Sequence, residues 1–247
     1  MPEPTQFNNP IRVNLASFPG GGTAVVFGAG GGIGRALTNA LSANDSFPTV
    51  RSYGRSTEIP IDFKDETSIA RAAADAATSG ELRLVIDATG LLHEDDLGPE
   101  KTLRTLDPSW LARNFLINAI GPAMMMKHLL PLLPRTGKSV FATLSARVGS
   151  IGDNRLGGWY GYRASKAALN QLVKTASIEL SRKCPQAACL AIHPGTVETN
   201  LSARFLRGRK HVHQPDEAAS RILRTLDQLD HRNTGGFFDC DGQTIVW

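Results

Sequence analysis

Two side chains four residues apart carry the first chemical signal in this chain. Tyr162 and Lys166 stand at the ends of the run YRASK, and on a helix a spacing of four residues places both side chains on one face. A free phenol has a pKa of about 10 and is a poor proton donor or acceptor at neutral pH. A neighbouring ammonium stabilises the phenolate, so we expect Lys166 to lower the pKa of Tyr162. The pair therefore predicts a general acid–base.

A cluster of glycines indicates a second site, one for phosphate groups. The run GAGGGIG at 28–34 follows an apolar run and opens an amphipathic helical pattern, which is the setting of a dinucleotide-binding turn. Gly28 permits a backbone turn with positive φ, an absent side chain at Gly32 leaves the helix N-terminus open to a pyrophosphate, and Gly34 allows close helix–strand packing. The residues expected around the phosphates are Gly28, Gly30, Gly32, Ile33 and Gly34.

Positive charge stands where many NAD enzymes carry an acid. The stretch RSYGRS at 51–56 ends the second expected strand and contains no acidic residue to hold a ribose 2′-hydroxyl. Arg55 in this stretch, and Arg35 directly after the last glycine of the cluster, suit a 2′-phosphate instead. The sequence therefore favours NADP over NAD as the cofactor.

The elements that must position these residues alternate along the chain. Short apolar runs expected as strands lie at 23–27, 47–53, 82–88, 139–145 and 187–193, and helical patterns lie between them and at 215–230. This alternation predicts an α/β fold of the Rossmann type, a doubly wound, mostly parallel sheet with helices on both faces. At 247 residues one such domain accounts for the length, over 22–247, and residues 1–21 are interpreted as an extension outside the core.

Composition argues against several other classes of protein. The sequence has no run of roughly 18 apolar residues and no signal-peptide pattern, so we expect no membrane association. Three cysteines without disulfide or zinc spacing favour the cytoplasm and no metal site. The net charge is +4, and its only dense basic stretch, at 204–213, is interpreted as a solvated loop rather than a nucleic-acid surface.

Taken together, these motifs resemble the short-chain dehydrogenase/reductase superfamily. The glycine spacing GxxxGxG and the YxxxK pair resemble its two signatures, and three further stretches follow in the family's order: LINAIGP at 116–122, the strand end at Ser145, and HPGTVET at 193–199. The stretch from Gly149 to Arg163 looks most like the C-factor-like branch. The resemblance covers about 22 to 247 and implies the same Rossmann-type fold.

The resemblance also assigns roles to individual residues. It implies an active-site amide at Asn118, a substrate-orienting hydroxyl at Ser145, and contacts of Tyr162 and Lys166 with the nicotinamide ribose. The resemblance adds further cofactor contacts. Asp62, at the end of a short strand expected between 53 and 62, would contact the adenine. The others are Thr89 and Gly90 in the turn after the strand 82–88, and Pro194, Gly195, Val197 and Thr199 at the nicotinamide.

Two departures from the family pattern stand in this chain. The usual NNAG reads DATG at 87–90; Gly90 preserves the turn, but the side-chain contacts of the family's Asn are lost. Ser145 lies farther before Tyr162 than is usual, so Ala146 could occupy the aligned position. Ser145 is preferred because Thr143 is its only rival hydroxyl at the strand end.

The expected activity is reversible hydride transfer between NADP and a carbonyl or alcohol, with Tyr162 as the acid–base. Ser145 would donate to the substrate oxygen, and Asn118 would hold a water that links Lys166 to solvent. The alternative, suggested by the C-factor-like resemblance, is an NADP-binding signalling or redox-sensing protein with little turnover. The substrate is expected to be a small molecule beneath a mixed apolar and basic loop at 197–215. A homodimer or homotetramer is implied by the resemblance, and a monomer remains open.

Overall fold

The computed structural model describes residues 13–208 and 211–247. Within these ranges six parallel strands form one sheet in the order β2-β1-β3-β4-β5-β6. The strands are β1 (Thr23–Phe27), β2 (Thr49–Tyr53), β3 (Leu82–Asp87), β4 (Ser139–Leu144), β5 (Ala187–His193) and β6 (Phe237–Asp239). The order reverses between β1 and β3, which creates a crevice at the carboxyl ends of these strands.

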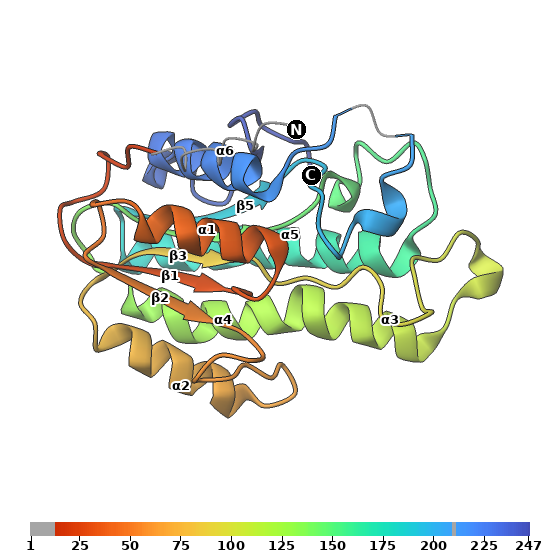
Figure 1. The fold of residues 1–247 in the computed structure, drawn as a ribbon, viewed down its shortest axis with the longest axis horizontal. Coiled ribbons are helices and arrows are strands. Elements are labelled where there is room, and N and C mark those ends of the chain that lie inside the picture. The colour runs from red at the N-terminus through yellow and green to blue at the C-terminus, as the bar shows by residue number, and fades with distance from the viewer. Residues whose placement is uncertain (1–12, 209–210) are drawn as a thin grey trace, which may run out of the picture.

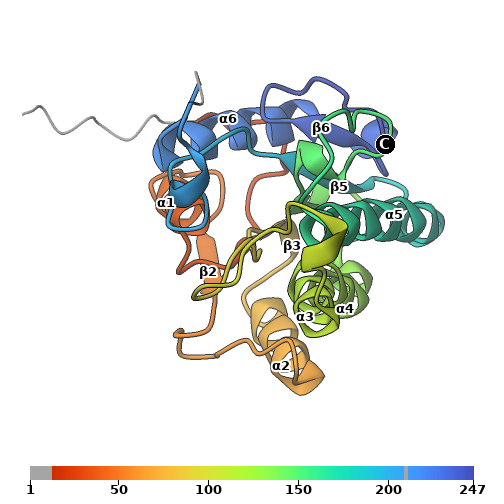
Figure 2. The same cartoon turned by 90° about the vertical axis from the view of Figure 1, so that its right-hand side faces the viewer.

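Helices cover both faces of the sheet, which confirms the predicted doubly wound fold (Figure 1, Figure 2). The helices are α1 (Gly32–Ser42), α2 (Glu66–Ala77), α3 (Pro108–Phe115), α4 (Gly121–Leu129), α5 (Tyr160–Lys183) and α6 (Pro215–Gln228). Helices α1 and α6 pack on one face, and α2, α4 and α5 pack on the other.

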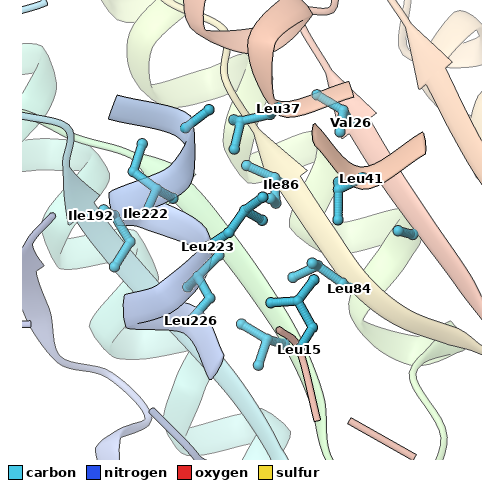
Figure 3. Packing of buried hydrophobic residues seen from close by; sticks show 14 of the residues in the cluster. Leu15, Val26, Leu37, Leu41, Leu84, Ile86, Ile192, Ile222, Leu223 and Leu226 are labelled. Atoms are coloured by element: carbon cyan, nitrogen blue, oxygen red, sulfur yellow. The ribbon is translucent and has the colours of Figure 1, made fainter. Parts of the chain in front are cut away.

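The strands bury side chains on both faces because each face has its own layer of helices. Figure 3 shows one layer, where α1 and α6 direct leucines and isoleucines onto the sheet. In β1, Val26 faces this layer, while its neighbour Val25 joins the opposite cluster with Met125 and Leu129 of α4. Alternate residues of a strand point to opposite faces, so the continuous apolar runs in the sequence are explained.

The helical run that begins at Pro108 consists of α3 and α4 joined by a π-helical turn at Leu116–Ile120. The helical run Pro108–Leu132 is long and apolar enough to cross a membrane by length and composition. Met125 and Leu129 nevertheless pack fully buried against the sheet. The apolar character of this run is therefore that of a core helix.

The interpretation of residues 1–21 as an extension outside the core is wrong for the part that the structure describes. Val13, Leu15 and Phe18 are buried in the cluster beneath α1 and α6, and Phe18 packs edge-on against Phe47 with ring centroids 5.4 Å apart. The sequence hid this contribution because only a few apolar residues stand among prolines, asparagines and glycines. Residues 1–12 lie outside the described part of the chain.

The strand expected to end at Asp62 does not form either. A single parallel bridge between Gly54 and Pro60 stands there, and Asp62 lies in the turn before α2, where its carboxylate accepts the Lys64 amide. The short stretch between Arg55 and Asp62 contains a proline, which cannot donate to a strand ladder.

Leu15→Ala tests the contribution of the N-terminal segment to the core. Leu15 is 1% exposed, so the substitution removes buried methyl groups and leaves a cavity, and we expect a loss of about 2–5 kcal/mol in the free energy of unfolding. Urea unfolding would measure it. The control Leu156→Ala removes a leucine that is 85% exposed and should leave stability nearly unchanged. Equal urea concentrations at the unfolding midpoint for the two variants would contradict the packing of this segment.

Candidate active site

The glycine turn between β1 and α1 has the geometry that the sequence predicts. Gly28 has a φ of +77°, and a Cβ there would lie 2.8 Å from the carbonyl carbon of Ala88. A Cβ at Gly34 would lie 2.2 Å from the Gly28 oxygen, so this glycine permits the close packing of α1 on the turn. At Gly32, a Cβ would collide with the methyl group of Thr199 at 2.7 Å. The turn therefore brings the loop after β5 onto the start of α1.

The N-terminus of α1 is open to an anion. Its N-cap residue Gly31 supplies no side-chain hydrogen bond, and the first turn carries no acidic residue. A Cβ at Gly30 would meet no atom within 4 Å, so open space lies in front of the turn. Unpaired amides and the positive end of the helix dipole bind phosphate groups. The residues present therefore fit the diphosphate of a dinucleotide, with Gly30, Gly32 and Ile33 nearest to it along the chain.

Arg55 and Asp62, predicted separately at the 2′-phosphate and the adenine, line one cavity. Its volume is about 450 Å³, and Pro60, Ile61 and Arg71 also border it. Gly54, the residue before Arg55, lies against the glycine turn, since a Cβ there would be 3.7 Å from the Gly30 amide. Arg35 is exposed in the first turn of α1. Two residues expected at the adenosine therefore share one cavity, and the chain just before Arg55 lies against the phosphate turn.

Tyr162 and Lys166 lie in the first two turns of α5, as their spacing predicts. The Lys166 ammonium is buried and donates to the Leu144 carbonyl at the end of β4, at 2.8 Å. Burial lowers the pKa of Lys166 to about 8, although the charge of Asp87 acts in the opposite direction. Burial also raises the pKa of Tyr162 to about 12. The expected lowering of the phenol pKa is absent from this structure because desolvation outweighs any effect of Lys166.

Asn118 lies in the π-helical turn between α3 and α4 and is fully buried. Its Oδ1 accepts the Leu91 amide at 2.8 Å, and its Nδ2 donates to the Leu91 carbonyl at 2.9 Å and to Ser165 Oγ at 3.1 Å. Ser165 directly precedes Lys166 on α5. The turn therefore ties the segment after β3 to the helix of the Tyr162–Lys166 pair, and such π-turns are frequent at functional sites.

The hydroxyls at the end of β4 have different partners. Thr143 donates to the buried carboxylate of Asp87 at 2.6 Å, whereas Ser145 Oγ lies 2.6 Å from Asn170 Oδ1. Sequence reasoning missed Asn170, which is buried and whose Nδ2 has no protein partner in the described chain. Its spacing was the available signal, because Tyr162, Lys166 and Asn170 stand at i, i+4 and i+8 on one helix face.

The turn DATG after β3 is held by its own aspartate. Asp87 Oδ1 accepts the amide and hydroxyl of Thr89 at 2.9 and 2.6 Å, so this carboxylate makes local contacts in place of the family's asparagine. A Cβ at Gly90 would lie 3.9 Å from Lys166 Nζ and 3.7 Å from Asn118 Oδ1. The backbone at Gly90 therefore passes directly over the catalytic candidates.

The loop after β5 folds back toward the glycine turn. Gly195, with a φ of +82°, follows Pro194, and Val197 forms a parallel bridge with His213. The Thr199 amide and hydroxyl approach Ser202 Oγ at 3.1 and 3.2 Å. Thr199 thus lies beside the start of α1, where the resemblance places a cofactor contact.

Three aromatic rings form a wall beside Tyr162. The Trp159 ring lies 6.2 Å from the Tyr162 ring and 5.3 Å from the Phe205 ring, both edge-on. The His93 ring lies 5.9 Å from Phe205, and its Nε2 is 3.1 Å from the Asn200 carbonyl. Residues from three separate segments therefore meet on the side of Tyr162 where Trp159 lies, and we call them the aromatic wall (His93, Trp159, Phe205).

His193 lies at the end of β5, just before Pro194, and its Nδ1 is buried without a partner in the described chain. Burial and the charge of Arg147 lower the pKa of His193 to about 4, against an opposing effect of Asp239. The ring is therefore neutral in the folded protein at neutral pH.

Comparison with known proteins gives a family and several relatives. A family model described as Enoyl-(Acyl carrier protein) reductase matches residues 28–245. The chain is 31% identical over 195 residues to 1-hydroxy-2-glutathionyl-2-methyl-3-butene dehydrogenase of Rhodococcus sp. (strain AD45), covering 78% of this chain and 81% of the relative. It is 32% identical over 178 residues to C-signal of Myxococcus xanthus, covering 72% of this chain and 99% of the relative.

Among solved structures, the NADPH-bound carbonyl reductase from chicken fatty liver matches with a TM-score of 0.81 and 24% identity, over 94% of this chain and 97% of that one. Carbonyl reductase Sniffer of D. melanogaster matches with a TM-score of 0.79 and 23% identity, over 93% of this chain and all of that one (100%). These structural likenesses agree with the Rossmann-type fold.

The buried neutral ring of His193 predicts an acid-sensitive stability. The folded-state pKa lies below the value of 6.5 for a free histidine, so as the pH falls the unfolded chain binds the proton first, and stability is lost between about pH 6.5 and 4. Relative to His193→Gln, the native protein should lose about 2 kcal/mol of unfolding free energy between pH 7 and pH 5.

Urea unfolding at both pH values would measure this loss. His211→Gln, at an exposed histidine, is the matched control and should follow the native pH dependence. Parallel stability curves for the native protein and His193→Gln would contradict the assignment.

Proposed function

The chain belongs to the short-chain dehydrogenase/reductase superfamily, and on this premise we propose that it transfers hydride between NADP and a small carbonyl or alcohol, with Tyr162 as the acid–base. The observation that carries the proposal is that Tyr162 and the buried Lys166 stand one turn apart on α5, with the Lys166 ammonium at the strand ends near Gly90. A phenol within reach of an ammonium can donate and accept a proton.

The chain's own residues hold and move one proton. In the reductive direction Tyr162 donates its phenol proton to the substrate oxygen, and the raised pKa of Tyr162, about 12, keeps that proton in place at neutral pH. In the oxidative direction Tyr162 must lose the proton, and the Lys166 ammonium then stabilises the phenolate. The resemblance places at Asn118 a water that would connect Lys166 with solvent, although the Asn118 side chain itself is committed to Leu91 and Ser165.

Ser145 orients the substrate oxygen. In this structure Ser145 Oγ donates to Asn170 Oδ1; when the Asn170 amide turns so that its Nδ2 faces the hydroxyl, Nδ2 donates to Ser145 Oγ instead. The Ser145 proton is then free to donate to an oxygen on which negative charge grows. Thr143 is not available for this role because it donates to Asp87.

The cofactor supplies the hydride, and the protein positions it. The residues that would hold its diphosphate are those of the glycine turn at 28–34, and Thr89, Gly90 and the segment 194–199 would contact its nicotinamide end. Arg55 and Arg35 would supply positive charge for a 2′-phosphate, and Asp62 lines the cavity that would receive the adenine. The absence of an acid between 51 and 56 leaves nothing there to repel that phosphate.

An aromatic or other flat apolar carbonyl compound suits the aromatic wall best. Trp159 packs edge-on against both Tyr162 and Phe205, and aromatic rings pair favourably in edge-on and offset arrangements.

We place the reaction in the cytoplasm, since the three cysteines are buried and free. Exposed Ile120 and Ile178 on the long helices support self-association through them.

Tyr162→Phe tests the proposal directly. Without the phenol proton, we expect kcat/KM for NADPH-dependent carbonyl reduction to fall about 100- to 10,000-fold, while NADPH still binds. NADPH consumption over a panel of aromatic and aliphatic ketones, together with NADPH fluorescence, would measure both. Tyr160→Phe, on the same helix turn, is the control and should retain activity. Full turnover by Tyr162→Phe would refute the role, and NADPH binding by the native protein without consumption would favour the signalling alternative.

Arg55→Ala tests the choice of cofactor. Loss of a charge-assisted hydrogen bond of about 1.5–3 kcal/mol should raise KM for NADPH about 10- to 100-fold and leave KM for NADH nearly unchanged; Arg35→Ala should act in the same direction. Steady-state kinetics with both cofactors would measure the ratio. Arg51→Ala is the control, because Arg51 is exposed and donates to Ser79. Equal losses with NADPH and NADH would count against a 2′-phosphate contact.

A further inference from the structure

The helix that carries Tyr162 and Lys166 begins without a cap of its own. Its N-cap residue Trp159 has a left-handed backbone, with φ 56° and ψ 42°, and makes no side-chain cap hydrogen bond. No acidic residue stands in its first turn. The first amides of a helix have no partner inside it, so those of α5 need an acceptor from another part of the chain.

Glu100, from the segment between β3 and α3, supplies that acceptor. Its Oε2 accepts the Gly161 amide at 3.0 Å, and its backbone carbonyl accepts the Trp159 amide at 2.5 Å. One residue therefore binds the start of α5 twice, from a position 61 residues earlier in the chain.

The burial of Glu100 indicates that this contact is specific. The residue is 4% exposed, and no ion pair to its carboxylate is found among the described residues. A buried carboxylate is costly unless hydrogen bonds or charges compensate it. Here Oε2 accepts one amide and faces the positive dipole end of α5, whereas Oε1 has no hydrogen-bond partner in the described chain.

Gly161 is matched to this arrangement. A Cβ at Gly161 would lie 2.8 Å from Glu100 Oε1 and 3.1 Å from Leu111 Cδ2. Only glycine lets the carboxylate approach the amide that directly precedes Tyr162. Glu100 and Gly161 thus form one contact, in which a change on either side separates the helix start from its acceptor.

We propose that Glu100 is a positioning residue for Tyr162: it caps α5 from outside the helix and fixes the backbone from which the phenol projects. The proposal rests on the acid–base role of Tyr162, since the effect on turnover passes through that side chain. Glu100 itself touches neither substrate nor cofactor. Small misplacements of a reacting group lower the rate of the chemical step more than they lower binding.

The kinetic test compares Glu100→Ala with Glu100→Gln. The alanine variant loses the side-chain acceptor of the Gly161 amide and keeps the backbone carbonyl that accepts the Trp159 amide, and we expect kcat to fall about 10- to 100-fold with KM for NADPH nearly unchanged. The glutamine variant retains an acceptor oxygen of the same reach and should restore most of kcat. Gly161→Ala pushes the carboxylate away and should resemble Glu100→Ala, which provides a second variant if the first does not fold.

Asp107→Ala is the matched control. Asp107 caps α3 by accepting the Trp110 amide at 2.7 Å, on the same loop but away from α5. Its carboxylate accepts from α3 and, among the described residues, from no amide of α5, so the variant should lower the melting temperature about as much as Glu100→Ala and leave kcat close to native. An equal fall of kcat in Asp107→Ala, or in Glu100→Gln, would overturn the proposal, because the effect would then follow general stability or the charge.

Amide hydrogen exchange gives a readout that does not need activity. Exchange across 158–165 should become faster in Glu100→Ala and Gly161→Ala and remain native-like in Glu100→Gln. Unchanged exchange in Glu100→Ala would overturn the capping contact. If the native protein reduces no carbonyl compound, the proposed function fails while exchange still decides whether Glu100 holds α5. Faster exchange with native kcat would show a cap that does not position Tyr162, and this result also overturns the proposal.

Discussion

The buried ammonium of Lys166 is the constraint on which the site depends. Removing a cation from water is costly, and the cost appears as the lowered pKa of Lys166, about 8. The Leu144 carbonyl at the end of β4 accepts one of its protons, and the charge of Asp87 at the end of β3 favours the cation. The neighbouring strands β3 and β4 thus provide both compensating groups, and only a parallel sheet brings their carboxyl ends together at one edge.

Asp87 shows how a departure from the family pattern fits the same constraint. Burial raises the pKa of this carboxyl group, against hydrogen bonds from Thr143 and Thr89 and the charge of Lys166, which all lower it. Asp87 thereby holds the turn at Thr89 while it compensates Lys166. The same hydrogen bonds commit Thr143 to Asp87, so Ser145, whose Oγ donates to Asn170 Oδ1, is the remaining hydroxyl at the end of β4.

The fold and the main motifs were readable from sequence because they rest on local patterns. The periodicity of apolar residues, the placement of glycines and the YxxxK spacing are properties of residues close together in the sequence. Gly28, Tyr162 and Lys166 stand where these patterns predict. The expectations that were wrong depend on distant partners. Leu15 joins the core through α6, and the phenol pKa of Tyr162 is set by burial that no spacing reveals. Glu100 acts on the start of α5 and Asn170 acts on Ser145 after β4, each across the fold. The sequence pattern therefore gives only a weak indication of their roles.

Buried polar atoms without a hydrogen-bond partner lower the stability of the folded protein, and several of them lie at the site. Among the described residues, the buried polar side-chain atoms without a partner include Asn170 Nδ2, Glu100 Oε1 and His193 Nδ1. Each lies beside an element of the site: Ser145, the start of α5, or the turn at Pro194. Buried polar groups are normally paired, and an unpaired one lowers stability. Two further unpaired atoms, Trp110 Nε1 in α3 and Ser139 Oγ at the start of β4, lie elsewhere, so such atoms are not confined to the site. The apolar layers on the two faces of the sheet supply the stability that offsets them.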